Sequence, residues 1–242
     1  MASTRPSLLV LLPPSEGKAE GGRAPAWKPT AGSFGRRLAD RRNEVLEALT
    51  AADGGDTRLL GVSGAHLDRA RRANMGLRGA PTLPASARYT GVVWDHLSPG
   101  TLSKRGSTRA TDSVVVVSGL LGLAAFDDPL PDYRLKMGAS LAPLGRLSKW
   151  WRDDLSAVLN AHARGRHVVD LLPGEHRAAW TPTPDEYASL SVVSFVEKNG
   201  KVAGHDAKAA KGLLARHLLE STGDPLAALK SWKHPRFRLR VD

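Results

Sequence analysis

The stretch "LLVLLPPSEGK", from Leu8 to Lys18, carries the strongest indication of the fold. Its apolar residues predict a buried strand over residues 7–12, and the two prolines that follow end that strand. A hydroxyl, a carboxylate and an ammonium then come within one turn, on Ser15, Glu16 and Lys18. Open α/β sheets bind ligands at the carboxyl ends of their strands, so this turn predicts a site. The simpler alternative is a polar loop that caps the strand.

Two later segments repeat this design of a buried strand followed by a polar turn. They are "SVVVVSGLLGL" at residues 113–123 and "HVVDLLPGE" at residues 167–175. If the three strands are adjacent and parallel, their turns meet at one edge of the sheet. The turns carry Ser15 and Lys18, Ser118 and Gly119, and Asp170 with Glu175 and His176.

The rest of the chain alternates helical and extended patterns. Helices are predicted over residues 34–51, 147–160 and 207–220, two short helices around "GVSG" at 61–64, and a short strand or turn followed by a helix over 87–97. Asn199-Gly200 predicts a hairpin within residues 189–204, and "RFRLRV" at 236–241 predicts an edge strand. We expect one mixed α/β domain over residues 1–242.

Composition limits the classes of protein that fit. The 242 residues include 35 Lys and Arg against 24 Asp and Glu, which gives a net charge of +11, so polyanions and anionic metabolites are the expected partners. The absence of cysteine excludes disulfides, thiolate metal sites and a cysteine nucleophile. No apolar stretch is long enough to span a bilayer, and the short apolar run near the N-terminus fits a first strand better than a signal peptide. We expect a cytoplasmic protein.

Two basic clusters are candidate anion sites. "PDYRLKMG" at residues 131–138 combines Tyr133 with Arg134, whose guanidinium can bind a phosphate or carboxylate with two hydrogen bonds. "HDAKAAKG" at residues 205–212 places Lys208 and Lys211 on the first turns of a helix, where a bound anion would offset their opposition to the helix dipole. The alternatives are an arginine paired with a structural carboxylate while Tyr133 packs inward, and two solvated lysines.

Other site templates fit poorly. Ser15 and Lys18 have the Ser-x-x-Lys spacing of a serine acyl-enzyme, but the companion motifs of such enzymes are missing. The chain has no phosphate-binding P-loop and no dinucleotide fingerprint. Its eight histidines are scattered, so we expect no metal site and no cofactor.

Taken in order, the motifs "LLPPSEGK", "GVVWD", "VSGLLG", "PDYRLKMG" and "HDAKAAKG" resemble those of the YaaA family of peroxide stress proteins, from Leu8 to about Glu220. The resemblance implies a single α/β fold with a helix-hairpin-helix element, here at about residues 57–78. It also implies a cytosolic protein that takes part in the response to oxidative damage and binds DNA.

The resemblance also implies candidate site residues. In the helix-hairpin-helix element, "GVSG" is a loose version of a phosphate-gripping turn, followed by three arginines that are candidates for DNA contact, Arg69, Arg71 and Arg72. The positions that match the other family motifs are Ser15, Lys18, Gly91, Val93, Trp94, Ser118, Gly119, Leu120, Gly122, Tyr133, Arg134, Leu135, Met137, Gly138, Lys208, Lys211 and Gly212. Lys136, Pro173 and His176 depart from the family pattern and point to a specialised member.

Three functions remain open from the sequence. The first is a stress protein that binds DNA or a phosphate-bearing ligand in a cleft rich in Lys and Arg, and we expect it to be a monomer. The second is an enzyme acting on a nucleoside- or nucleotide-like molecule by N-glycosidic or phosphoester cleavage, with catalytic candidates Glu175, Asp170, His176 and Lys18. Its ligand would be bound by Ser15, Lys18, Trp94, Ser118, Gly119, Tyr133, Arg134, Lys208 and Lys211. The third is a scaffold whose polar clusters only support the fold.

Overall fold

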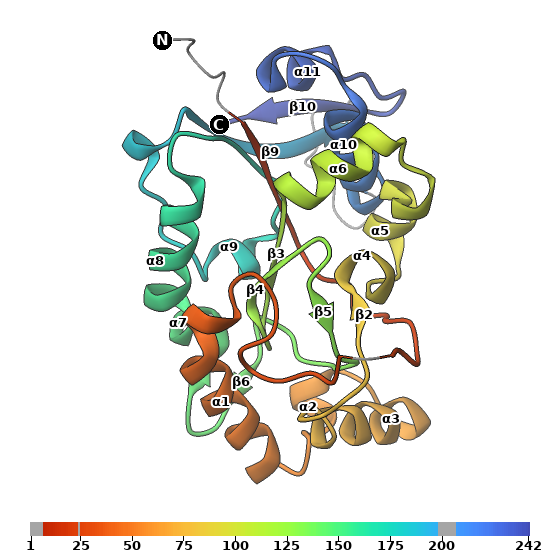
Figure 1. Ribbon diagram of the computed structural model, residues 1–242, viewed down its shortest axis with the longest axis vertical. Helices are drawn as coiled ribbons and strands as arrows, with labels where there is room; N and C mark the ends of the chain where they lie inside the picture. The colour runs from red at the N-terminus through yellow and green to blue at the C-terminus, as the bar shows by residue number, and fades with distance from the viewer. Residues whose placement is uncertain (1–6, 24, 198–206) are drawn as a thin grey trace.

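The computed structural model describes residues 7–23, 25–197 and 207–242. Its centre is a six-stranded sheet in the order β10-β9-β8-β1-β3-β4 (Figure 1). The strands of this sheet are β1 (Leu8–Leu12), β3 (Val114–Ser118), β4 (Gly122–Ala125), β8 (His167–Asp170), β9 (Ser189–Glu197) and β10 (Phe237–Val241). The prediction of a mixed α/β fold is therefore confirmed.

The three strands that the sequence predicts to converge are adjacent and parallel. β1 pairs with β3 through Val10 and Val114 and with β8 through Leu11 and Asp170, and β8 continues parallel to β9. Every residue of β1 and β3 is buried, as expected for central strands with both faces covered. The chain leaves β1 toward β3 on one side and later adds β8 on the other. The carboxyl end of β1 therefore lies at a topological switch point.

Helices cover the sheet on both faces. In Figure 1, α1, α7 and α8 lie on one side of the sheet, and α5, α6 and α10 lie on the other. The bounds of these helices are α1 (Gly35–Ala51), α5 (Val92–Leu97), α6 (Lys104–Ser113), α7 (Leu147–Trp150), α8 (Arg152–Ala163) and α10 (Ala207–Glu220). The shorter elements are α2 (Thr57–Leu60), α3 (Gly64–Met75), α4 (Ala85–Arg88), α9 (Gly174–Arg177), α11 (Pro225–Ser231), η1 (Pro99–Thr101), η2 (Pro184–Glu186), β2 (Leu83–Pro84), β5 (Pro129–Leu130), β6 (Ser140–Leu141) and β7 (Gly145–Arg146).

Most predicted elements form as expected, with two differences. The predicted strand in 113–123 ends at the Ser118-Gly119 turn as expected, but the residues after the turn form a second strand, β4, which returns antiparallel to β3. Gly122 begins β4 with a φ of 65°, a left-handed conformation that favours glycine. The predicted helix over 147–160 is divided at Trp151 into α7 and α8. The Asn199-Gly200 turn lies outside the described residues.

Two buried arginines connect the loops to the core. The guanidinium of Arg42 is buried and donates to four carbonyl oxygens, those of Pro29, Ala31, Leu121 and Leu123, at 2.8–2.9 Å. Burial lowers the pKa of Arg42 to about 10. Arg88, which is fully buried, similarly donates to loop carbonyls. These two side chains satisfy backbone groups in segments that have little regular structure of their own.

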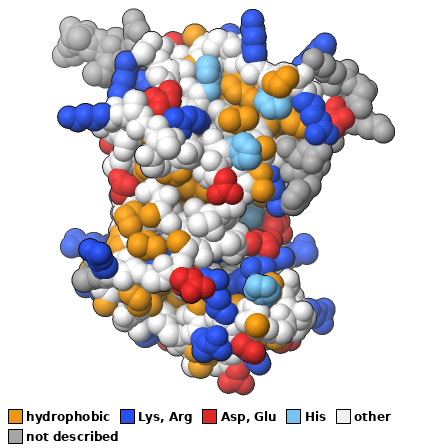
Figure 2. Space-filling view, turned by 90° about the vertical axis from the view of Figure 1, so that its right-hand side faces the viewer, with side chains coloured by type: hydrophobic (Ala, Val, Ile, Leu, Met, Phe, Trp, Pro, Cys, Tyr) orange, Lys and Arg blue, Asp and Glu red, His pale blue; other side chains and the backbone are white. Residues whose placement is uncertain are grey.

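On one face of the molecule the basic side chains are dispersed (Figure 2). On the face shown in Figure 2, Lys and Arg side chains alternate with acidic, histidine and hydrophobic ones. Among the described residues, no helix combines the length and the apolar character needed to cross a membrane.

Candidate functional site

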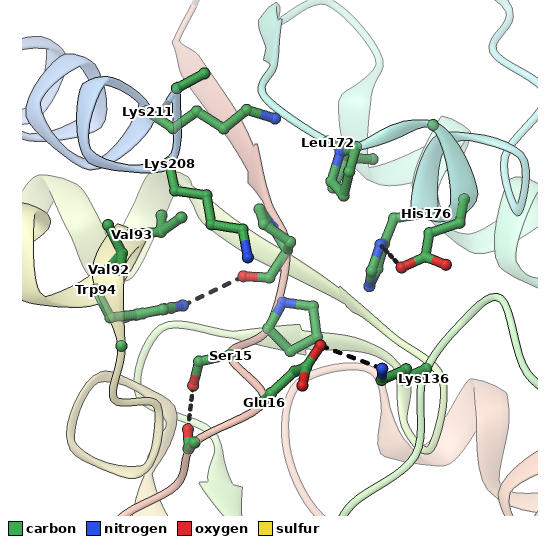
Figure 3. A pocket seen from close by; sticks show the side chains of 18 of the residues that line it. Ser15, Glu16, Val92, Val93, Trp94, Lys136, Leu172, His176, Lys208 and Lys211 are labelled. Carbon is green, nitrogen blue, oxygen red and sulfur yellow. Dashed lines mark hydrogen bonds and ion pairs between the residues drawn. The ribbon is translucent and has the colours of Figure 1, made fainter. Parts of the chain in front are cut away.

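A cavity of about 740 Å³ opens at the carboxyl ends of β1 and β8 (Figure 3). Its wall comes from segments far apart in the sequence. They are the turn after β1, the start of α5, the loop before β6, the turn into α9, the middle of β9 and the start of α10. Of the described residues, six cationic side chains and two carboxylates line it: Lys18, Arg134, Lys136, Arg177, Lys208, Lys211, Glu16 and Glu175.

The turn after β1 is fixed by its own hydrogen bonds. The Ser15 hydroxyl donates to the carbonyl of Gly17, and the Lys18 ammonium donates to the carbonyl of Ser15 over 2.8 Å. The indole N–H of Trp94 donates to the carbonyl of Pro13 over 3.2 Å, which connects α5 to the end of the strand. Ser15, Lys18 and Trp94 all line the cavity, as the sequence predicts.

Lys18 is the most deeply buried of these cations. Its side chain packs against two aromatic rings, with Nζ 4.0 Å from the ring centre of Tyr133 and 5.6 Å from that of Tyr89. No carboxylate of the described residues lies within 4.0 Å of its Nζ. Burial lowers the pKa of Lys18 to about 7, although Asp132 partly offsets this effect. The amine therefore changes from charged to neutral as the pH rises through about 7.

Arg134 and Lys136 form the rim next to this turn, and Glu16 neutralises part of their charge. The Glu16 carboxylate lies 2.7 Å from Nη2 of Arg134 and 3.5 Å from Nζ of Lys136. Burial raises the pKa of Glu16, but the two cations outweigh it and the net shift is downward. Asn74 accepts from the backbone N–H of Arg134 over 2.9 Å, which fixes the loop at α3.

The arginine motif therefore combines both roles that its sequence allows. Arg134 faces the cavity and is also paired with a carboxylate, while Tyr133, Leu135 and Met137 are buried, as the structural alternative expects.

The first turns of α10 contribute the second group of cations. Lys208 is exposed and points into the cavity, and Lys211 donates to the carbonyl of Leu171 over 2.7 Å (Figure 3). Among the described residues, neither lysine has a carboxylate within 4.0 Å of its Nζ. Burial is the main cause that lowers the pKa of Lys211 to about 8, with Asp170 opposing the shift. Two lysines that pair with no described carboxylate therefore face this end of the cavity.

The short helix α9 contributes Glu175 and His176 from the opposite wall. The side chain of His176 is 9% exposed, and its Nδ1 lies 3.9 Å from the Glu175 carboxylate without a hydrogen-bond partner among the described residues. Burial, and then the charge of Lys211, lower the pKa of His176 to about 4, so the ring is neutral at physiological pH. The Glu175 side chain is half exposed and lines the cavity.

Four predicted site residues lie behind the wall and not on it. Asp170 is fully buried, where it accepts from the Leu172 N–H over 2.7 Å and from Arg177 over 2.5 Å. Ser118 and Tyr133 share a 2.8 Å hydrogen bond that continues to Tyr89. Gly119 packs on the backbone of Lys136, where a Cβ would lie 2.9 Å from the carbonyl carbon. These groups position the residues that line the cavity.

The predicted helix-hairpin-helix region contains two helices, α2 and α3, joined by residues 61–63. Arg69 forms ion pairs with Glu20 and Asp132 at 3.1 Å, and Arg71 donates to the carbonyl of Gly55. Arg72 is exposed. Two of the three arginines therefore bind groups of the protein itself. DNA contact by this element remains a prediction.

Several residues of the cavity have no role that the sequence predicts. Glu16 lies within a predicted site turn without an assigned role, and the apolar wall made by Val92, Val93, Leu172 and Phe195 is not predicted at all. Phe195 has the alternating burial of an ordinary sheet strand, so its place beside the cavity depends on the pairing of β9 with β8. Among the described residues, no cluster of three or more histidine or acidic side chains could hold a metal ion.

Comparison with known proteins places the chain in a family. Residues 8–242 match the family model described as "Peroxide stress protein YaaA". A UPF0246 protein of Streptomyces coelicolor is 36% identical over 224 residues, which is 90% of this chain and 85% of that protein. A UPF0246 protein of Corynebacterium efficiens is 37% identical, over 91% of this chain and 89% of that protein. The chain that forms this cavity and its cationic wall therefore belongs to the YaaA family of peroxide stress proteins.

Proposed function

We propose that this protein binds a small phosphate-bearing molecule in the cavity at the end of β1, and that this binding is its contribution to a peroxide stress response. The observation that carries the proposal is the gathering of cations on one cavity, with Lys208 and Lys211 lacking carboxylate partners among the described residues. A cavity of about 740 Å³ has the size of a small-molecule site. Apolar residues beside the cations would strengthen their attraction for an anion, because they exclude water.

DNA is the alternative partner of the same basic protein. The size of the cavity favours a small anion, since a duplex contacts proteins through an extended surface. Arg69 and Arg71 are engaged within the fold, and the basic side chains on the face in Figure 2 are dispersed. These observations favour a small-molecule ligand as the primary partner.

Isothermal titration calorimetry with inorganic phosphate tests the proposal. The double variant Lys208→Ala/Lys211→Ala should bind phosphate at least about tenfold more weakly, because each charge-assisted hydrogen bond contributes roughly 1.5–3 kcal/mol. The control is Lys149→Ala/Lys230→Ala, which removes the same charge from exposed positions on α7 and α11. Equal affinities in the wild type and both double variants would refute the proposal.

An enzymatic role for the cavity is a second candidate, favoured by the neutral imidazole of His176 on its wall. A neutral imidazole can accept a proton from water that attacks a bound phosphoester or N-glycosidic bond. Incubation with nucleoside monophosphates, followed by chromatography for free base and phosphate, tests this role. Turnover that disappears in His176→Gln supports it, and the absence of any product contradicts it.

A further inference from the structure

The two walls of the cavity differ in chemistry. On the α10 side, Lys208 and Lys211 offer positive charge. On the α9 side Glu175 offers a carboxylate and His176 a neutral ring, and the one cation there among the described residues, Arg177, is already paired with the buried Asp170. A carboxylate repels an anionic group and accepts hydrogen bonds. The part of the ligand that faces α9 must therefore be uncharged and must donate hydrogen bonds.

The Glu175 carboxylate lies close to the backbone at Gly138. A Cβ added at Gly138 would overlap the Glu175 carboxylate, so glycine at this position leaves the space that the carboxylate occupies. Gly138 lies two residues after Lys136 in the loop that forms the rim of the cavity. The acceptor therefore lies at the edge of the cavity, between this loop and α9.

His176 provides an independent indication of a ligand. Its side chain is more than nine-tenths buried and lies on the cavity wall, yet Nδ1 has no hydrogen-bond partner among the described residues and the Glu175 carboxylate stands 3.9 Å away (Figure 3). Buried polar atoms are nearly always hydrogen-bonded in folded proteins. A group that both donates and accepts hydrogen bonds, placed between these two side chains, would satisfy both of them.

A hydroxyl group meets these requirements better than an amine. A hydroxyl donates to a carboxylate and also accepts from a neutral imidazole N–H, whereas an ammonium only donates. An ammonium would also add positive charge to a cavity already lined by six cationic side chains of the described residues. The uncharged, hydroxyl-bearing part of a sugar or polyol fits the α9 wall.

We infer that the ligand is a phosphorylated polyol or sugar, with its phosphate at Lys208 and Lys211 and a hydroxyl group bound by Glu175 and His176. This inference rests on the proposed function, because it assigns the second half of the same ligand. Glu175 and His176 are in this view the residues that determine specificity, and the lysines supply affinity for any phosphate.

A matched pair of probes tests the phosphate half and the hydroxyl half of the ligand separately. Glycerol 3-phosphate and n-propyl phosphate have the same three-carbon chain and phosphate, but only the first carries hydroxyl groups. The wild-type protein should bind glycerol 3-phosphate about tenfold more tightly in calorimetry, since a hydrogen bond to a charged group contributes at least about this factor.

Variants test which residues cause the preference for glycerol 3-phosphate over n-propyl phosphate. Glu175→Ala should reduce the ratio of the two affinities to near one and leave binding of n-propyl phosphate unchanged or slightly stronger. Gly138→Ala, which displaces the carboxylate without removing it, should reduce the ratio as well. The control is Glu47→Gln at an exposed position of α1, which should keep the wild-type ratio.

The outcomes distinguish this inference from the proposed function. If both probes bind the wild-type protein equally and Lys208→Ala/Lys211→Ala weakens both, the phosphate site stands and the hydroxyl inference is wrong. If neither probe binds, both proposals are wrong. If the preference for glycerol 3-phosphate persists in Glu175→Ala and in His176→Gln, another part of the cavity binds the hydroxyl group. The assignment of this group to α9 is then overturned.

Discussion

At the scale of single residues, Lys18 shows how a local environment changes the chemistry of a common side chain. The sequence predicts an anion-binding ammonium at this position. The structure buries the amine against two tyrosine rings, with no carboxylate of the described residues within 4.0 Å of its Nζ. Its pKa of about 7, mainly the result of burial, makes its charge depend on pH in the physiological range.

We predict that anion binding weakens as the pH rises from 6 to 9. Lys18 and Lys211, with pKa values lowered by burial to about 7 and about 8, are protonated below these values and neutral above them. Sulfate is the suitable probe because its own charge does not change in this range. Calorimetry should show the highest sulfate affinity at pH 6.

The Lys18→Arg variant separates the contributions of the two lysines. Arginine stays charged throughout this range, so the variant should lose less affinity between pH 6 and pH 8 than the wild type does. The loss of sulfate affinity that remains as the pH rises should come from deprotonation of Lys211, whose pKa is about 8. A wild-type affinity that stays constant from pH 6 to pH 9 would contradict the explanation.

At the scale of the secondary-structure elements, the packing of α10 against α5 controls where the lysines of α10 lie. Gly212 makes this close approach possible. A Cβ at this position would overlap the carbonyl oxygen of Val93 and would lie 2.8 Å from Cβ of His96 and 2.9 Å from the backbone N of Leu97. The two helices are therefore closer than any other side chain at position 212 would permit.

We predict that Gly212→Ala lowers the melting temperature, although alanine favours a helix over glycine by about 1 kcal/mol. The added methyl group must push α10 away from α5, and the poorer packing outweighs the gain in helix propensity. Thermal unfolding measures the effect. Gly100→Ala is the control, because a Cβ there has no described atom within 4 Å, and it should leave the melting temperature nearly unchanged.

The elements also show how far the sequence can predict the site. The strand-then-turn pattern predicted that the turns after β1, β3 and β8 meet at one edge of the sheet, and residues of the turns after β1 and β8 do line one cavity. It predicted the turn at Ser118 and Gly119 but not β4, because the short apolar run after the turn does not show that the chain returns antiparallel to β3. It left α6 unassigned, since that helix is mostly polar and buries mainly small residues.

At the scale of the whole molecule, the order of the strands explains the position of the cavity. β1 lies between β3 and β8, so the loops that leave these neighbours diverge and create a crevice at its carboxyl end. Strand order depends on long-range pairing, which residue patterns do not encode. The apolar wall, which includes Phe195 from β9, was unpredictable from the sequence for this reason.

The net charge of +11 belongs to the molecule as a whole and leads to a test of DNA binding. If α3 binds a duplex, Arg72→Glu should weaken binding and reduce the salt dependence, by roughly 0.9 in log–log slope for each phosphate that the variant no longer neutralises. Fluorescence anisotropy with a labelled duplex measures both quantities. Arg36→Glu on α1, an exposed position, is the control for the change in charge. Identical slopes for wild type and Arg72→Glu would argue against DNA binding by α3.

The cavity wall joins the first strand of the chain to a helix that begins at Ala207. During synthesis, the turn after β1 leaves the ribosome long before Lys208 and Lys211 are made. A nascent chain therefore cannot bind the ligand through these lysines until α10 has emerged. A bound anion would connect two segments that lie far apart in the sequence, and it would stabilise the folded protein because it binds only after both are in place.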